Sequence, residues 1–358
     1  MTRPQDPLLV VQDLKVAFHT DHGVAEVLDG VNLEIGRGEV VGLVGESGCG
    51  KSTLGRAILG IVPKPAGEVR GGSIRFKGQD LLGLDPRFAA RAIRGRRITF
   101  IPQDPFGSFN PLFTVGGQLM DLMKFKSPRA PAEEGAIRTP AILRRYPAQR
   151  REEDRAAVIA MLREVQIPKP EQALGKYPHE LSGGQRQRIM IAMALLPEPE
   201  LIVADEPTTA LDVTIQAQVL RLLRDLVRKR SVSVLFTTHD LGTASELCDR
   251  VLVMYAGQDV EAAETDLFFR TPRHPYTVKL LEALPNEEGR LVDIPGHIPP
   301  LVDPPKGCRF HTRCDRASAR CRTERPEVDR PERGHAVRCH HPVPVGEPRL
   351  PAAAEQGR

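Results

Sequence analysis

Short apolar runs and amphipathic segments of helical period alternate along this 358-residue chain. Residues 8–44 hold several apolar runs separated by polar turns, a pattern typical of β-strands. The candidate strands there are Leu8–Val11, Leu14–Phe18, Val31–Ile35 and the continuously apolar Val40–Val44. Residues 73–81 alternate apolar and polar positions around a turn at Lys77-Gly78, which predicts a further strand and turn.

Helical periodicity first appears after these strands. One predicted helix face consists of Leu54, Ala57, Ile58 and Ile61. Residues 119–196 are mostly helical in pattern, with an apolar face at Val158, Met161, Leu162 and Val165. Residues 124–151 interrupt that pattern with Pro, Ala and basic side chains. We interpret this interruption as a variable surface insertion that faces solvent rather than lipid headgroups.

The later part of the chain repeats a strand–helix–strand order. Candidate strands are Ile98–Ile101, Leu201–Ala204 and Ser233–Thr238. An apolar helical stripe precedes the last of them, at Ile215, Val219, Leu222, Leu223 and Leu226. Alternating β and α patterns predict a mainly parallel sheet, with ligands bound beyond the carboxyl ends of its strands.

Composition excludes some classes of protein. Hydrophobic residues at 41% and charged residues at 27% are typical of a globular protein. With 4% aromatic residues and no Trp, aromatic platforms that stack nucleic acid are not expected. No apolar run is long enough to span a bilayer, and the N-terminus lacks the apolar segment of a signal peptide. We therefore expect a cytoplasmic protein whose cysteines are reduced or bind metal.

The candidate chemistry begins directly after Val40–Val44. The next residues match the phosphate-binding pattern G-x-x-x-x-G-K-[ST], between a strand pattern and a helix pattern. They are Gly45, Glu46, Ser47, Gly48, Cys49, Gly50, Lys51, Ser52 and Thr53. Glycines let the backbone wrap an anion, and the helix N-terminus directs N–H groups at it. Lys51 can reach the β- and γ-phosphates, Ser52 can bind Mg²⁺, and Cys49 is interpreted as a small buried side chain.

Polar residues follow three of the later strands. Gln103 can reach a metal ion or orient a water, although such a residue alone is usually part of an ordinary loop. Asp205 and Glu206 are adjacent, so their side chains point in opposite directions and can have separate roles. Asp205 can complete a Mg²⁺ shell while Glu206 polarises the attacking water. His239 can donate a hydrogen bond to a γ-phosphate.

The stretch Leu181–Gln185 reads Leu-Ser-Gly-Gly-Gln and precedes a helical pattern. Two interpretations are open from the residues alone. The exposed N–H groups of a helix N-terminus can form a second phosphate site. Alternatively, Ser182 is an ordinary N-cap.

In this order the motifs resemble those of the ATP-binding subunit of an ATP-binding cassette (ABC) transporter. The matching set also includes Ala210-Leu211-Asp212, and the resemblance covers roughly residues 8–260. It implies that Lys51, Gln103, Glu206 and His239 are catalytic, with Glu206 as general base. It further implies that ATP is bound by Gly45–Thr53, Gln103 and His239, with Phe18 stacked on adenine where the family often has Tyr.

The resemblance also implies a metal and a second subunit. Mg²⁺ would be held by Ser52, Gln103 and Asp205. A dimer of cassettes would sandwich two ATP molecules, each completed by residues of the opposite subunit. Those residues are Ser182, Gly183, Gly184, Gln185 and Asp212.

The implied fold class is α/β, a P-loop NTPase (RecA-like) core with an antiparallel β subdomain and an α-helical subdomain. The ABC ATPase domain is expected over residues 1–262, with the helical subdomain about 104–195 and the insertion about 125–152. A C-terminal extension with a metal cluster is expected over 263–345, followed by a disordered tail at 346–358.

Finer resemblance points to the oligopeptide/dipeptide importer branch and to the first of its two paired ATPases. The matching stretches are 103–111, 205–214 and 273–277, the last reading Arg-His-Pro-Tyr-Thr. This implies a Mg²⁺-dependent ATP hydrolase that drives peptide uptake. Its partners would be a paralogous second ATPase, two membrane-spanning permeases and an extracytoplasmic substrate-binding protein, and nucleic acid would not be a partner. The expected location is the cytoplasmic face of the cell (inner) membrane.

Other substrates and activities are alternatives to this interpretation. The same motor could serve a nickel complex or glutathione. A soluble cassette ATPase acting on nucleic acid or ribosomes is disfavoured, because the chain has one cassette and no sustained heptads.

Four of the six cysteines fall in a Pro- and Arg-rich tail, at Cys308, Cys314, Cys321 and Cys339. In a cytosolic protein such a group marks a metal site more readily than disulfides. The spacing is unlike the C-x₂-C pairs of structural zinc, and thiolate ligation suits a [4Fe–4S] cluster. The importer branch carries such a cluster in a similar tail, which favours iron and sulfur here. Zn²⁺ is the alternative, with His311, His335, His340 and His341 as further candidate ligands. Cys248 is expected in the core.

Overall fold

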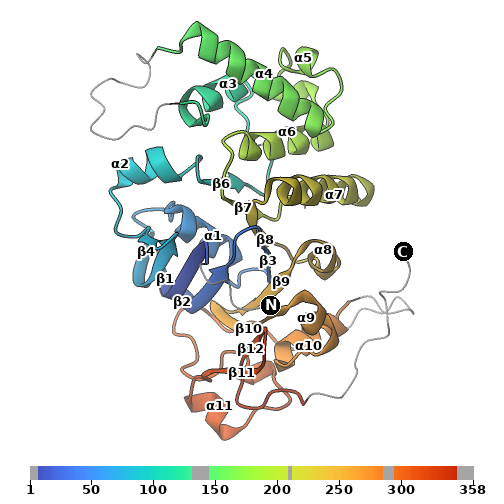
Figure 1. The fold of residues 1–358 in the computed structure, drawn as a ribbon. Helices are drawn as coiled ribbons and strands as arrows, with labels where there is room; N and C mark the ends of the chain where they lie inside the picture. Colours follow the sequence, from blue (N-terminus) through green and yellow to red (C-terminus); the bar gives the residue numbers. More distant parts are fainter. Residues whose placement is uncertain (1–6, 106, 131–144, 209–211, 285–293, 345–358) are drawn as a thin grey trace. The chain divides into compact units, whose positions relative to one another are not determined.

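The computed structural model describes residues 7–105, 107–130, 145–208, 212–284 and 294–344. The chain forms two compact units, one built from residues 1–82 and 236–358 and the other from residues 83–235 (Figure 1). Both units contain strands and helices. No helix among the described residues is long and apolar enough to cross a membrane.

An antiparallel sheet in the order β2-β1-β4-β5 forms one part of the first unit. Its strands are β1 (Leu9–Thr20), β2 (Gly23–Ile35), β4 (Gly67–Phe76) and β5 (Gln79–Asp80). The two strands predicted over residues 8–18 are one strand, whose pairing shifts around Asp13 at a φ of 45°. The predicted turn is confirmed, since Lys77 and Gly78 have φ of 50° and 78° between β4 and β5.

Strands of a mixed sheet form the other part of this unit, in the order β11-β12-β10-β9-β3. They are β3 (Val40–Val44), β9 (Arg250–Tyr255), β10 (Gln258–Glu264), β11 (Val328–Glu332) and β12 (His335–Arg338). The boundary between the two units falls within β8 (Ser233–Thr237). β3 pairs with β9 in parallel, whereas β9, β10, β12 and β11 are antiparallel neighbours. The parallel pairing of β3 with β9 agrees with the predicted parallel sheet. β10, β11 and β12, which were not predicted from the sequence, add an antiparallel part, and short turns connect β9 to β10 and β11 to β12.

The helical elements of this unit are α1 (Lys51–Leu59), α8 (Leu241–Leu247), α9 (Thr265–Arg270), α10 (Pro275–Glu282), η4 (His311–Arg313) and α11 (Ala319–Thr323). α1 is shorter than predicted, because Gly60 takes the left-handed conformation and ends it. Ile61 was expected on its apolar face but lies beyond the helix end, 43% exposed. Cys248 ends α8 and is buried, as predicted.

The second unit is mostly helical around the parallel pair β6 (Ile98–Ile101) and β7 (Leu201–Asp205). Its helical elements are α2 (Pro86–Phe88), η1 (Ala89–Ile93), α3 (Val115–Lys126), α4 (Ala148–Glu164), α5 (Pro170–Ala173), η3 (Pro178–Glu180), α6 (Gly183–Leu195) and α7 (Val213–Arg230). The predicted apolar faces are buried on α4 and α7, except that Ile215 is only half-buried. Burial of these stripes holds the helices together.

The predicted insertion at about 125–152 is described only at its two ends, and residues 131–144 lie outside the described part. Both ends meet the buried carboxylate of Asp154 on α4. Ser127 Oγ and Tyr146 OH donate hydrogen bonds to it at 2.7 and 2.8 Å, and Arg150 lies 3.7 Å away. The predicted tail at 346–358 and the Ala210-Leu211 part of the third motif also lie outside the described residues.

Buried ion pairs fix the C-terminal residues to the first unit. Arg309, only 2% exposed at its side chain, bonds Asp29 at 3.0 Å and Glu26 at 3.2 Å on β2. On β12, His335 Nε2 lies 2.6 Å from Glu261 Oε1 on β10, and both side chains are fully buried. Burying a charged group costs free energy unless it is paired, so these contacts specify one position for the extension.

Candidate active site

The predicted phosphate loop joins β3 to α1 with a backbone that only glycine permits at its first position. Gly45 has a φ of 150°, and a Cβ added there would collide with the carbonyl oxygen of Met254 on β9. Gly50 has a φ of 108° and would place a Cβ 2.9 Å from Val27 O. Strands β9 and β2 therefore press directly against the loop and fix its path.

Lys51 begins α1 and folds back across the loop. Its ammonium donates hydrogen bonds to Gly45 O at 2.7 Å and Glu46 O at 3.2 Å, and the side chain is nearly buried. Ser47 and Gly48 are exposed, whereas Ser52 and Thr53 are half-buried in the first turn of α1. Cys49 is fully buried, as predicted, and burial raises the pKa of its thiol. The arrangement gathers a cation and a helix N-terminus at one place, which is what a phosphate requires.

Glu46 connects this loop to the C-terminal residues. Its carboxylate accepts two hydrogen bonds from Arg313, from Nη1 at 2.8 Å and from Nη2 at 3.1 Å. Its backbone N–H donates to the Tyr276 hydroxyl at 2.9 Å. Burial raises the pKa of that Tyr276 hydroxyl, with the carboxylate of Glu46 as a further cause. Sequence reasoning missed both partners, because they lie more than 200 positions away along the chain.

The two other predicted ATP contacts in this unit are Phe18 and His239. Phe18 is half-buried near the end of β1, and a Cβ on Gly67 of β4 would lie 2.8 Å from its ring. His239 is exposed two residues after β8. Their contacts with a nucleotide stay a prediction.

In the second unit, the structure brings Gln103 and Glu206 together. Gln103 follows β6, Glu206 follows β7, and Gln103 Nε2 donates a hydrogen bond to Glu206 Oε2 at 3.2 Å. Asp205 is buried as the last residue of β7. Glu206 has a φ of 45°, a conformation that costs a residue with a side chain about 1 kcal/mol or more and occurs preferentially at functional sites.

The Leu-Ser-Gly-Gly-Gln stretch opens α6 with reciprocal capping bonds. Ser182 Oγ accepts from Gln185 N at 3.3 Å, and Gln185 Oε1 accepts from Ser182 N at 3.1 Å. Gly183 and Gly184 form the first turn, where a Cβ on Gly184 would lie 2.9 Å from Ile215 of α7. The N-cap interpretation is thus correct, and it keeps an exposed helix N-terminus available. Asp212 is the exposed N-cap residue of α7.

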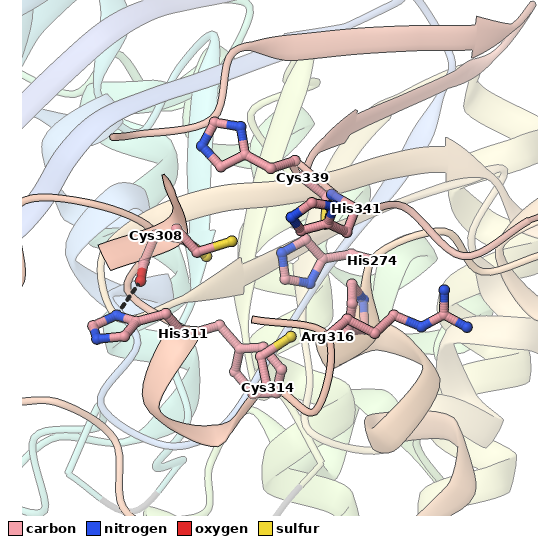
Figure 2. A pocket seen from close by; sticks show the side chains of 11 residues that line it. His274, Cys308, His311, Cys314, Arg316, Cys339 and His341 are labelled. Carbon is pink, nitrogen blue, oxygen red and sulfur yellow. Dashed lines mark hydrogen bonds between the residues drawn. The ribbon is translucent and has the colours of Figure 1, made fainter. Parts of the chain in front are cut away.

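All four tail cysteines line one small cavity, although they lie in separate segments of the chain. Figure 2 shows three of them, Cys308, Cys314 and Cys339, around its interior. The thiols are free, and burial raises the pKa of Cys308 to about 11 and that of Cys339 to about 12. Among the described residues, no group of three or more His, Cys, Asp or Glu side chains is arranged to hold a metal ion.

The histidines near this cavity differ from the predicted set. His311, His340 and His341 line it, but His335 does not, because Glu261 holds it between β12 and β10. The unpredicted member is His274, which lies at the cavity wall in Figure 2. Its Nδ1 accepts a hydrogen bond from Tyr276 N at 3.1 Å and so caps α10. Its buried Nε2 has no hydrogen-bond partner among the described residues, and burial lowers its pKa to about 4.

Two protein-family models match this chain, one after the other along the sequence. Residues 28–209 match the ABC transporter model, and residues 260–321 match the C-terminal region of oligopeptide/dipeptide transporters. A solved dimeric ABC cassette bound to ADP and phosphate superimposes with a TM-score of 0.59 at 26% identity, covering 72% of this chain and 98% of that one. A cassette from Clostridium perfringens gives a TM-score of 0.58 at 26% identity, with coverage of 74% and 91%.

Two relatives are similar to this chain over nearly its whole length. A probable peptide ABC transporter ATP-binding protein of Sinorhizobium fredii is 46% identical, with 93% of this chain and 95% of the relative covered. The dipeptide transport ATP-binding protein of Escherichia coli is 40% identical, with coverage of 96% and 99%. These matches confirm the predicted family and the cassette fold. The chain belongs to the ABC transporter family, as an ATP-hydrolysing subunit of the oligopeptide/dipeptide branch.

Proposed function

We propose that this chain binds and hydrolyses ATP to drive import of dipeptides or oligopeptides through a membrane complex. The observation that carries the proposal is the similarity over nearly the whole chain, tail included, to ATP-binding proteins of peptide transport. The loop geometry supports it, because the glycine backbone and Lys51 form a site for a polyphosphate. The specific substrate is carried by other subunits of such a complex.

The predicted site residues have different roles in phosphoryl transfer. Lys51 and the first turn of α1 bind the phosphates, and Phe18 and His239 contact the two ends of the nucleotide. Ser52, Gln103 and Asp205 supply the hard oxygen donors that Mg²⁺ prefers. When bound, Mg²⁺ neutralises charge on the phosphate oxygens.

Glu206 is the general base in this proposal. Its hydrogen bond with Gln103 supports the role. The bond holds the two side chains together, where both can contact one attacking water.

We infer a second cassette, expected to be a paralogue, that completes each ATP site. The exposed N-terminus of α6, with Ser182 to Gln185, offers N–H groups that the helix itself does not use. Asp212, at the start of α7, is also exposed for such a contact. The dimeric form of the cassette that this chain resembles supports this arrangement.

The membrane partners in this proposal are two permease subunits, supplied by an extracytoplasmic substrate-binding protein. The chain then lies at the cytoplasmic face of the membrane. A contact surface is offered by Leu112 and Phe113, which follow Gln103 and are 79% and 57% exposed. Large apolar side chains this exposed mark a protein contact more often than a solvated loop when they are adjacent.

We propose that the cysteine cavity holds an iron–sulfur cluster rather than a single Zn²⁺ ion. Each thiolate of a [4Fe–4S] cluster binds a different iron, so the four cysteines stand further apart than around one ion. All four cysteines line one cavity. The unpaired Nε2 of His274 at the wall also fits, since a sulfur-rich group would accept its hydrogen bond. We propose Cys308, Cys314, Cys321 and Cys339 as the ligands of a group that staples the extension.

Replacing Gly45 with Ala is expected to abolish ATP binding, because the new methyl group collides with Met254 O and displaces the loop. Gly48→Ala is the matched control. It also has a positive φ, of 81°, but its Cβ would meet nothing within 4 Å. Isothermal titration of both variants with ATP separates the two effects. Equal affinities for the two variants would contradict the argument from close approach.

Changing Glu206 to Gln is expected to lower ATP turnover by roughly a hundredfold or more while ATP still binds, because the amide cannot accept a proton. The measurement is steady-state phosphate release by the assembled transporter, with nucleotide binding followed in parallel. Gln103→Glu serves as a comparison that keeps the carboxylate of Glu206. An unchanged turnover in Glu206→Gln would remove the general-base role.

Replacing Leu112 and Phe113 together with Asp is expected to leave ATP binding intact but to release the chain from its membrane partners. Two buried apolar contacts would be exchanged for charges, which are costly in such an interface. Co-purification with the permeases from detergent-solubilised membranes provides the readout. The control exchanges exposed Phe88 for Asp. Retention of the partners by the double variant would argue against this surface.

Protein purified without oxygen is expected to be brown, with iron and sulfide in near-equal amounts, and a colourless, zinc-loaded sample would contradict the cluster.

The variant His274→Asn tests whether His274 donates a hydrogen bond to the cluster. Asn can still cap α10 but withdraws the Nε2 donor from the cavity. Loss of a hydrogen bond to sulfur is expected to make the reduction potential more negative. An unchanged potential in a fully loaded variant would count against the donor role.

A further inference from the structure

Arg313, like Tyr276, belongs to the C-terminal extension and contacts the phosphate loop. It ends the short turn η4, and its side chain is only 3% exposed. An arginine has five N–H donors in a rigid fork, and here every one of them is used. Nε bonds Pro295 O, Nη1 bonds Glu46 Oε2 and Tyr255 OH, and Nη2 bonds Glu46 Oε1 and Ile294 O. A lysine could supply the charge of this group but not its geometry.

A glutamate at position 46 is electrostatically unfavourable for the binding of ATP. It is the second residue of a loop that must attract the negatively charged phosphates of ATP, and a carboxylate there repels them. Its side chain is 27% exposed, so solvent screens that repulsion only in part. Arg313 cancels the charge and fixes both carboxylate oxygens in a bidentate pair.

The position of Lys51 makes this neutralisation important. Its ammonium already lies 3.2 Å from the carbonyl oxygen of Glu46. A carboxylate released from Arg313 belongs to that same residue, and it could turn to pair with Lys51. It would then compete with the phosphates for the one lysine that is placed to bind them.

We infer that Arg313 is a positioning residue for ATP, which holds the carboxylate of Glu46 away from Lys51 and cancels its charge. The C-terminal extension thereby contributes to the affinity of the phosphate loop. This inference rests on the proposed function, because it assigns a role in the binding of the same nucleotide.

The other explanation is that Arg313 only anchors the extension. Arg309 allows the two to be separated, because it is a second buried arginine of the same segment. It pairs with Glu26 and Asp29 on β2 rather than with the phosphate loop. Loss of either arginine weakens the docking of the extension, but only loss of Arg313 leaves Glu46 without its partner.

The test measures the affinity of the full-length chain for a β,γ-imido analogue of ATP by isothermal titration, in about 50 mM and about 300 mM salt. Arg313→Met is expected to weaken binding about tenfold at the lower salt and clearly less at the higher, because the repulsion is screened. Adding Glu46→Gln to Arg313→Met is expected to restore most of the affinity. When Glu46→Gln is added to Arg309→Met instead, it is expected to restore none of the affinity for the analogue that Arg309→Met removes.

Three results would overturn the inference. They are wild-type affinity in Arg313→Met, a loss that does not depend on salt, and a loss that Glu46→Gln fails to restore. If Arg313→Met does not fold, as judged by circular dichroism and thermal unfolding, Arg313→Lys and Arg313→Gln carry the test. Their lengths differ little, and the lysine variant should bind the analogue several-fold more tightly because it keeps the charge; equal affinities would overturn the inference.

The same titration distinguishes failure of the inference from failure of the proposed function. Wild-type chain must bind the analogue, and Lys51→Ala must not. A wild-type chain without any affinity would refute ATP binding at this loop. A wild-type chain that binds normally, beside an unaffected Arg313→Met, would refute only the role of Arg313.

Discussion

A buried guanidinium must be paired with a carboxylate, and this constraint governs how the first unit is assembled. Arg309 and Arg313 bring two such groups into the interior from one short segment of the extension. The acceptors come from β2 and from the phosphate loop. Removing one partner of such a pair leaves an uncompensated buried charge at a cost of about 3–5 kcal/mol. The extension, the antiparallel sheet and the loop therefore adopt their positions together.

Features that follow from a motif or from the end of a predicted strand could be predicted from the sequence. The loop Gly45–Thr53 is defined by the spacing of its glycines and Lys51, and the structure supplies the close approach that requires glycine at Gly45. The meeting of Gln103 with Glu206 follows from placing each residue after one of two parallel neighbouring strands. The capping bonds of Ser182 follow from a serine three positions before a glutamine.

Features that depend on distant residues could not be predicted in this way. Nothing near Glu46 in the sequence points to Arg313, 267 positions later, as its partner. His335 was a candidate metal ligand because it is one of several histidines in the cysteine-bearing tail, but it bonds instead with the buried Glu261 on β10. His274 belonged to a motif that indicated only the branch of the family, and its unpaired Nε2 became visible once α10 and the cysteine segments were placed together. α1 also ends earlier than predicted. The apolar pattern extended to Ile61, but Gly60 ends the helix.

The first residues of α10 touch both functional regions of the first unit within one turn. His274 faces the cysteine cavity, while Tyr276, two residues later, receives the N–H of Glu46. Between them, Phe310 packs against Tyr255 and Tyr276 with ring centroids 5.1 and 5.4 Å apart. Close-packed aromatic groups of this kind leave little room for independent movement. A group bound by the cysteines would thus help to fix the segment that carries Arg309 and Arg313, since Cys308 and Cys314 lie at its two ends. On this argument the tail supports the nucleotide site through the bonds that Arg313 and Tyr276 make with Glu46.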